Sequence, residues 1–173
     1  MDAVILVDEL DHETGIAEKL EAHRKGLLHR AFSVLLFNSK GELLLQQRAA
    51  GKYHSGNLWT NTCCSHPRKG EPVKLAAQRK LKQEMGIEAN LEFSHKFIYK
   101  AALDHGLTEH EYDYVFFGVS DHVPVINPEE AQAWRFETLD QVREEIENRP
   151  ELFTSWFRII MQQPEIKNAP SGL

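Results

Sequence analysis

The segment from Glu109 to Phe117 constrains the fold most, because alternating side chains in a strand lie on opposite faces and both faces here carry apolar groups. One face carries three acids followed by two apolar residues: Glu109, Glu111, Asp113, Val115 and Phe117. We predict a strand covered on both sides, whose carboxylates need a cation, a basic partner or a proton. The alternative is an edge strand with solvated acids. We expect Asp113 to be structural or salt-bridged.

The overall composition limits the classes of partner. A chain of 173 residues with 42% hydrophobic residues fits one globular domain with its own core. Its net charge of −6 gives no reason to expect nucleic acid or an anionic membrane as the main partner. No stretch is apolar enough to cross a bilayer, and the first residues lack the basic region of a signal peptide. We therefore expect a cytoplasmic protein, in which a local basic pocket could still bind a small anion.

Apolar periodicity and turn residues predict the secondary structure. Strands are predicted at 4–7, 31–37, 42–48, 93–100 and 109–119, with a hairpin turn at 38–41 and a polar hairpin or loop at 8–15. Helices are predicted at 16–23, 72–85, 138–146 and 152–161, the third with a capping box formed by Thr138 and Gln141. Residues 49–71 lack periodicity, which is typical of a functional segment. This mixture without regular alternation indicates an α+β or layered α/β/α domain.

Both cysteines lie in the segment Trp59–Pro67. Cys63 and Cys64 are adjacent and cannot form a relaxed disulfide, so we expect two thiols, as in a reducing compartment. In an extended segment, Cys64 and His66 face one way and Cys63 the other. A nearby cation in their shared pocket is expected to lower the thiol pKa. The simpler interpretation is an inert buried thiol beside a solvent-facing histidine.

His66 could join His23 and His29, which flank the entry to the first long strand. With two glutamates they would form a nitrogen- and oxygen-rich site, which suits Mn²⁺, Zn²⁺ or Fe²⁺ better than Ca²⁺. The other histidines are interpreted as ordinary: His12, His54, His95, His105, His110 and His122. Arg48 and Lys52 are a reasonable pair for a diphosphate, since one offers a fork of donors and the other a compact charge.

Residues 65–87 resemble the Nudix signature, Gly-x5-Glu-x7-Arg-Glu-U-x-Glu-Glu-x-Gly-U, where U is aliphatic. Ser65 replaces the first glycine, and the matching residues are Glu71, Arg79, Leu81, Glu84, Gly86 and Ile87. Lys80 and Gln83 stand where Nudix hydrolases have metal-binding glutamates. Losing two anionic ligands should weaken the Mg²⁺ cluster that activates water for diphosphate cleavage.

Three further motifs make the chain similar to the type I isopentenyl-diphosphate isomerases, a family with the Nudix fold. They are Ala22-His23-x5-His29-Arg30-Ala31-Phe32-Ser33, Trp59-Thr60-Asn61-x2-Cys64-x-His66-Pro67 and Glu109-x-Glu111. The resemblance extends from residue 17 to residue 156. It implies a Nudix-type mixed sheet flanked by helices, in one domain spanning 1–173 with an N-terminal extension of about 1–28 and a frayed tail of about 165–173.

The resemblance also implies an activity and a site. The family converts isopentenyl diphosphate into dimethylallyl diphosphate, an isoprenoid precursor, by protonation and deprotonation through a tertiary carbocation. Cys64 and Glu111 would lie on opposite faces of the alkene, with Tyr99 supporting Glu111 and Trp156 facing the cation. Simpler interpretations are a core tryptophan at 156 and an ion pair of Glu84 with Lys80.

The implied ligands fall into three sets. Mn²⁺ or Zn²⁺ would be bound by His23, His29, His66, Glu109 and Glu111. Mg²⁺ would join the diphosphate to Glu84 and Cys64. The remaining phosphate charge would be held by Lys19, Arg48, Lys52 and Lys80. The expected partner is this small-molecule diphosphate, and the expected assembly is a monomer or weak homodimer.

Two other functions remain open from the sequence. A Nudix hydrolase acting on a nucleoside or prenyl diphosphate would release phosphate, and Lys80 and Gln83 argue against it. A non-catalytic metal-binding or interaction module would retain metal but turn over no diphosphate. The role of Cys63 is also open.

Overall fold

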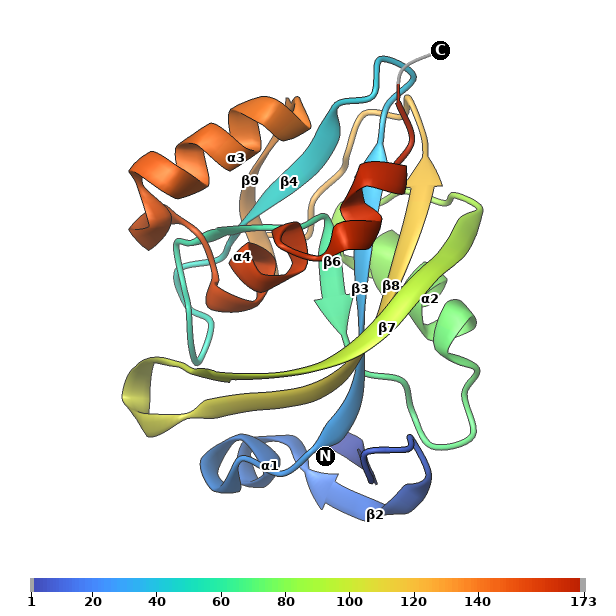
Figure 1. Ribbon diagram of the computed structural model, residues 1–173, viewed down its shortest axis with the longest axis vertical. Coiled ribbons are helices and arrows are strands. Elements are labelled where there is room, and N and C mark those ends of the chain that lie inside the picture. The colour runs from blue at the N-terminus through green and yellow to red at the C-terminus, as the bar shows by residue number, and fades with distance from the viewer. Residues whose placement is uncertain (1, 172–173) are drawn as a thin grey trace.

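The computed structural model describes residues 2–171, and their strands pair into one mixed sheet (Figure 1). The strands are β1 (Ala3–Val7), β2 (Glu13–Glu18), β3 (His29–Phe37), β4 (Leu43–Arg48), β5 (Trp59–Thr60), β6 (Cys63–Ser65), β7 (Leu91–Ala102), β8 (Thr108–Val119) and β9 (Ala131–Glu137). The helices are α1 (Lys19–Lys25), α2 (Val73–Met85), α3 (Leu139–Asn148) and α4 (Ser155–Met161), with 3₁₀ turns η1 (Asp104–Gly106), η2 (Pro150–Leu152) and η3 (Pro164–Asn168). No helix within 2–171 is long and apolar enough to cross a membrane.

The central strand β3 pairs in parallel with β8 over nine residues, from His29 opposite Glu111 to Phe37 opposite Val119. β8 also pairs antiparallel with β7, so the acidic strand lies inside the sheet. This position contradicts the alternative of an edge strand with solvated acids. Glu109, Glu111 and Asp113 are accordingly buried, as expected for a strand covered on both sides.

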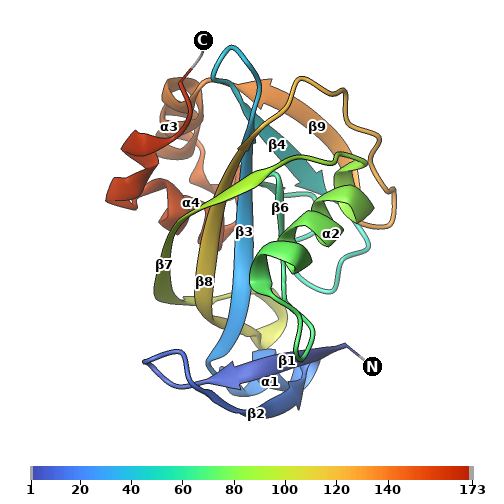
Figure 2. The same cartoon turned by 90° about the vertical axis from the view of Figure 1, so that its right-hand side faces the viewer.

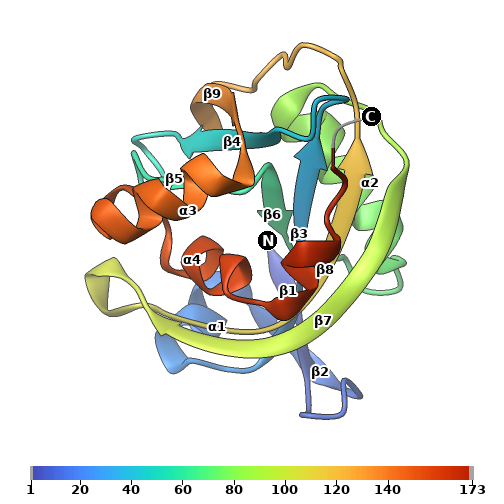
Figure 3. The same cartoon turned by 45° about the horizontal axis from the view of Figure 1, so that its top comes forward.

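The two faces of the sheet carry different helices (Figure 2). On one face, Phe32, Val34 and Leu36 of β3 pack in a core with α2. On the other, Leu35 and Phe37 pack with α3, α4 and η3, and β7 curves around α4 (Figure 3). This alternation gives the predicted layered arrangement. The three acids belong to the α4 face, because they alternate in step with Val115 and Phe117.

Helix α2 lies within the predicted helix 72–85 and buries one face. Ala77, Leu81 and Met85 are fully buried, and Gly86 ends the helix in a left-handed conformation with φ 67°. Pro72 is the N-cap rather than the first helical residue, and its side chain makes no cap hydrogen bond. The predicted capping box of Thr138 and Gln141 is present at the start of α3.

Several predicted elements are wrong in pairing or extent. The arms β3 and β4 pair only at Phe37 with Leu43, because β3 pairs with β6 and β8 while β4 pairs with β5 and β9. Strand β9 was not predicted from the sequence. Residues 16–18 are strand rather than helix, and the predicted helix 152–161 is divided between η2 and α4 by Thr154, which caps α4.

The C-terminal segment also differs from the expected frayed tail over 165–168. These residues form part of η3, and Ile166 is 1% exposed within the core of the α4 face. Residues 172–173, also included in the expected tail, lie outside the described residues.

The α2 core yields a stability prediction. Leu81→Ala should lower the free energy of unfolding by about 2–5 kcal/mol, because it leaves a cavity in a fully buried position. Leu75→Ala is the matched control: Leu75 lies on the same helix but is 56% exposed, so its change should stay within about 0.5 kcal/mol. Urea denaturation followed by circular dichroism measures both. Equal effects would contradict the assignment of this face of α2 to the core.

Candidate active site and metal centre

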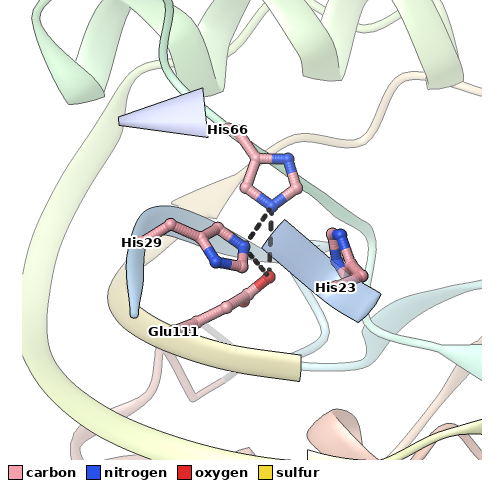
Figure 4. Close-up of side chains that lie close together, drawn as sticks. All are labelled: His23, His29, His66 and Glu111. Atoms are coloured by element: carbon pink, nitrogen blue, oxygen red, sulfur yellow. Dashed lines mark hydrogen bonds and ion pairs between the residues drawn. The ribbon is translucent and has the colours of Figure 1, made fainter. Parts of the chain in front are cut away.

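Three histidines and Glu111 converge from four separate elements (Figure 4). His23 lies on α1, His29 begins β3, His66 follows β6 and Glu111 lies on β8. The Nε2 atoms of His29 and His66 are 3.2 Å apart. Glu111 Oε1 lies 3.1 Å from His66 Nε2 and 3.5 Å from His29 Nε2. The structure therefore brings together four of the five predicted ligands, which lie up to 88 positions apart in the numbering, whereas Glu109 groups with His23 and His54.

Backbone carbonyls fix the orientation of two of these rings. Nδ1 of His23 lies 2.6 Å from the carbonyl oxygen of Lys19, and Nδ1 of His29 lies 2.8 Å from that of Leu27. A carbonyl can only accept, so each Nδ1 carries the proton and each neutral Nε2 presents a lone pair to the cluster. This arrangement is typical of metal-binding histidines.

The spacing of the donor atoms fits a divalent ion. Ligands bonded at about 2.1 Å in an octahedron stand roughly 3.0 Å from their neighbours. The contacts of 3.1 to 3.5 Å around His66 and Glu111 are close to this spacing. Burial lowers the pKa of His66 to about 3, despite the opposing effect of Glu111, so its ring is also neutral. The His/Glu cluster is thus a candidate divalent metal site.

Glu109 and Glu111 form a buried acid pair whose pKa values shift in opposite directions. Oε2 of Glu109 lies 3.1 Å from Nε2 of His23. Burial, reinforced by the charge of Glu111, raises the pKa of Glu109 well above its ordinary value. Burial also opposes ionisation of Glu111, but contacts with His29 and His66 outweigh it and hold the pKa of Glu111 well below the ordinary value. Two interacting buried carboxylates need a proton or a cation to offset their repulsion.

Tyr99 supports Glu111 from the neighbouring strand. The two residues face each other in the β7–β8 register, and the Tyr99 hydroxyl donates to Oε2 of Glu111 over 2.7 Å. Burial raises the pKa of Tyr99 well above its ordinary value, so the phenol keeps its proton as a donor. Each oxygen of Glu111 thus has its own neighbour: Tyr99 at Oε2 and the imidazoles at Oε1.

The four predicted catalytic residues line one cavity of about 430 Å³: Cys64, Glu111, Tyr99 and Trp156. Cys64 and His66 line it, whereas Cys63 is fully buried in the core beside α2, as the extended segment predicted. A nearby cation, Arg48, lowers the pKa of the Cys64 thiol as expected, but its effect is outweighed. Desolvation raises the pKa of Cys64 well above its ordinary value, and the nearby charge of Arg48 only partly offsets it. The thiol therefore keeps its proton at neutral pH.

The mouth of the cavity is basic. The four predicted phosphate-binding residues all line it: Lys19, Arg48, Lys52 and Lys80. Burial and the neighbouring ammonium of Lys52 lower the pKa of Lys19. Glu130, which the sequence analysis missed, lies 2.7 Å from Lys52 Nζ and 3.9 Å from Lys80 Nζ. Like charges gathered around a cavity favour an anionic ligand.

Glu84 projects from α2 into the same cavity. Its Oε1 lies 3.3 Å from Lys80 Nζ, and its Oε2 accepts from the amide of Gln46 over 3.0 Å. The expected i,i+4 ion pair with Lys80 is therefore present, and Glu84 remains available at the cavity wall. Gln83, the other departure from the Nudix signature, is exposed, while Glu71 forms a two-bond ion pair with Arg79.

Trp156 is only 3% exposed, yet it lines the cavity from α4. The guanidinium carbon of Arg48 lies 5.2 Å from the centre of its ring. Trp156 is thus a core residue and a cavity residue at once. Asp113 lies deeper and accepts from the Ser33 hydroxyl over 2.8 Å, while its Oδ1 has no hydrogen-bond partner within 2–171. Burial raises the pKa of Asp113 well above its ordinary value. Asp113 forms no salt bridge within 2–171, so it is a structural residue rather than a salt-bridged one.

The irregular segment supplies further residues that sequence reasoning missed. His54, interpreted as ordinary, is 4% exposed and forms a second candidate metal group with His23 and Glu109. Tyr53 also lines the cavity, and its ring stands 5.9 Å from that of His23. Only the lack of periodicity in 49–71 pointed to them, because no spacing rule connects this loop to β8.

Comparison with known proteins defines the family. Residues 27–157 match the NUDIX domain. The isopentenyl-diphosphate Delta-isomerase of Pectobacterium atrosepticum is 51% identical over 156 residues, covering 90% of this chain and 87% of the relative. Isopentenyl-diphosphate Delta-isomerase 2 of Aromatoleum aromaticum is 50% identical over 155 residues, covering 90% and 82%.

Solved structures agree on the fold. The crystal structure of DR0079 from Deinococcus radiodurans superposes with a TM-score of 0.74 at 17% identity, covering 92% of this chain and 97% of that one. The MutT protein from Methanosarcina mazei gives a TM-score of 0.67 at 16% identity, covering 83% and 96%. The fold is thus that of a Nudix protein. The chain belongs to the isopentenyl-diphosphate Delta-isomerase family within the Nudix superfamily.

The cluster yields a metal-binding prediction. His66→Ala should weaken Mn²⁺ binding by at least about 10-fold, because it removes a candidate ligand, and even residues that only support ligands contribute that much. Mn²⁺ titration followed by the paramagnetic resonance of the free ion measures the affinity. His105→Ala is the control, since the His105 side chain is 74% exposed and lies outside the cluster. Unchanged binding by His66→Ala would refute the assignment.

Proposed function

We propose that this protein isomerises isopentenyl diphosphate to dimethylallyl diphosphate, with Cys64 and Glu111 as its proton-transfer groups. The relatives named for this activity match about 90% of the chain. The observation that carries the proposal is the single cavity lined by a protonated thiol, a buried carboxylate and a basic mouth. Isomerisation by this route adds one proton to the alkene and removes another from the carbon on the far side of the cation, so atoms and charge balance.

The residues divide this chemistry between them. An alkene is a very weak base, so the acid must be held against it with water excluded. Cys64 keeps its thiol proton, and the hydrogen bond from Tyr99 holds Glu111 in one orientation. The ring of Trp156 would stabilise the carbocation by about 1–2 kcal/mol through a cation–π contact.

The metal centre is assigned to Mn²⁺ or Zn²⁺ on the basis of its donors. His23, His29, His66, Glu109 and Glu111 supply imidazole nitrogen and carboxylate oxygen, which suit these ions. The ion would neutralise the buried acid pair and fix its geometry. A separate Mg²⁺ would join Glu84, and with it Cys64, to the diphosphate.

The basic mouth supports diphosphate binding. Lys19, Arg48, Lys52 and Lys80 would hold the phosphate oxygens, with Arg48 offering its fork of donors. Glu130 already contacts Lys52, so the diphosphate would compete with this carboxylate for the ammonium group.

We also propose that residues 1–173 act as one domain, because His23 and Lys19 lie within the N-terminal extension of about 1–28 and reach the site. Two free thiols favour a cytoplasmic location. A complete cavity within one chain favours function as a monomer or weak homodimer.

Hydrolysis is the second candidate, because the fold is that of Nudix hydrolases. Lys80 disfavours it, since this residue neutralises Glu84 instead of adding a metal ligand. Gln83, the other replaced glutamate, is exposed and neutral.

A single incubation distinguishes isomerase, hydrolase and non-catalytic metal protein. Purified protein is supplied with isopentenyl diphosphate, Mg²⁺ and Mn²⁺ in deuterated water. We expect deuterium at carbon, detected by mass spectrometry, with no release of phosphate. Phosphate release without carbon label would establish hydrolysis, and neither signal with retained metal would establish a binding module.

The adjacent cysteines provide a matched pair of variants. Cys64→Ala should abolish deuterium incorporation, because it removes the only thiol that lines the cavity among the described residues. Cys63→Ala should keep most of the activity, since its side chain lies in the α2 core. Initial rates of label incorporation compare the two. The reverse pattern would refute the assignment of Cys64.

A further inference from the structure

His54 occupies an unexpected place next to the acid pair. It lies in the irregular loop between β4 and β5, and its Nε2 is 3.6 Å from Oε1 of Glu109. The other oxygen of Glu109, Oε2, lies 3.1 Å from Nε2 of His23. The Glu109 carboxylate therefore lies between two imidazoles, with one near each oxygen.

The loop presents His54 through a defined set of contacts. Nδ1 of His54 lies 3.0 Å from the hydroxyl of Ser55. The backbone N–H of Ser55 donates to the carboxylate of Asp104, in the β7–β8 connection, over 3.0 and 3.2 Å. Arg48 donates to the carbonyl of His54 over 3.1 Å. Ser55 adopts φ 54°, a conformation that costs free energy in a residue with a side chain, so these contacts stabilise one particular loop shape.

The protonation of the ring follows from its neighbours. The position of the ring N–H is set by the contact at Nδ1. The Ser55 hydroxyl can donate to Nδ1, which leaves the proton on Nε2 facing Oε1 of Glu109. The ring also stands edge-on to Trp156, at 5.6 Å between centres and 87° between planes.

We propose that His54 is a positioning residue of the metal centre: it holds Oε1 of Glu109 so that Oε2 points at the ion beside His23. The inference rests on the proposed metal centre and extends it by a residue outside the recognised motifs. A carboxylate that binds an ion through one oxygen needs its other oxygen restrained, and such supporting contacts commonly govern metal affinity.

The alternative of a second ion on His54 is disfavoured by the bonding of His23. Nδ1 of His23 is occupied by the Lys19 carbonyl, so only Nε2 can bind a metal. The ion that takes His23 together with His29, His66 and Glu111 uses that nitrogen. His54 is then left with Glu109 alone, which is too few ligands for a separate site.

The test compares His54→Phe with His54→Gln in the full chain, without substrate. Mn²⁺ and Co²⁺ affinities are measured by titration, and the absorption spectrum of bound Co²⁺ reports its ligands. His54→Phe should weaken binding about 10-fold, because the ring shape remains but the donor is lost. His54→Gln should recover most of the affinity, because its amide can donate to Glu109, and its Co²⁺ spectrum should match that of the unmodified protein.

Two controls keep the test decisive. His95→Phe replaces a histidine that is 8% exposed and lies 3.9 Å from Glu165, outside the centre, and it should leave affinity unchanged. Ser55→Gly removes the hydroxyl, tolerates the positive φ and should weaken binding in the same direction as His54→Phe. The Ser55→Gly result applies even if His54→Phe fails to fold.

The possible outcomes separate this proposal from the proposed function. Full metal affinity in His54→Phe would overturn the positioning role. Altered Co²⁺ spectra in both His54 variants would also overturn it, because they would show that His54 is a direct ligand. Failure of the unmodified protein to bind either ion would refute the metal centre itself. Metal binding without isomerisation would refute only the activity.

Discussion

The parallel pairing of β3 with β8 is the constraint on which the rest of the site depends. Its register sets His29 opposite Glu111 and Ser33 opposite Val115. Because alternate residues share a face, this one register places the acid pair, the first histidine of β3 and the apolar core under α4 on the same side of the sheet. A slip by one residue would turn Glu109 and Glu111 toward α2, where no histidine of the cluster lies among the described residues.

Because the acids Glu109 and Glu111 are buried, their negative charges need compensation by nearby protons or cations. Two carboxylates and three imidazoles lie mostly out of contact with solvent, and the pKa values of Glu109 and Glu111 shift in opposite directions as a result. A divalent cation at the His/Glu cluster would offset the repulsion between the acids. Desolvation raises the pKa of Cys64, and the nearby charge of Arg48 only partly offsets it. The departure from the Nudix signature at Lys80 also compensates charge. Where Nudix hydrolases have another acid beside the residue that corresponds to Glu84, this chain has Lys80, which forms an ion pair with Glu84.

Local patterns predicted much of this structure, and long-range pairing accounts for the failures. The alternation in β8 correctly indicated a covered strand, and the stripe on α2 gave its buried face. The β3–β4 hairpin was predicted from its turn, but its arms separate because each finds better partners far along the chain. The motifs named His23, His29 and His66, whose convergence the structure supplies. His54 carried no signal, because its position depends on Asp104 and Glu109, which only the folded loop brings near.

The position of His23 on α1, near the N-terminus, also affects the stability of the folded chain. His23 and Glu109 are 86 residues apart in the chain, and a shared ion would act as a cross-link that closes this long loop in the folded state. Binding only to the folded state stabilises a protein by mass action. Metal starvation would therefore loosen the N-terminal helix first and expose it to proteases, so that the cellular supply of the ion would set the lifetime of the enzyme as well as its turnover.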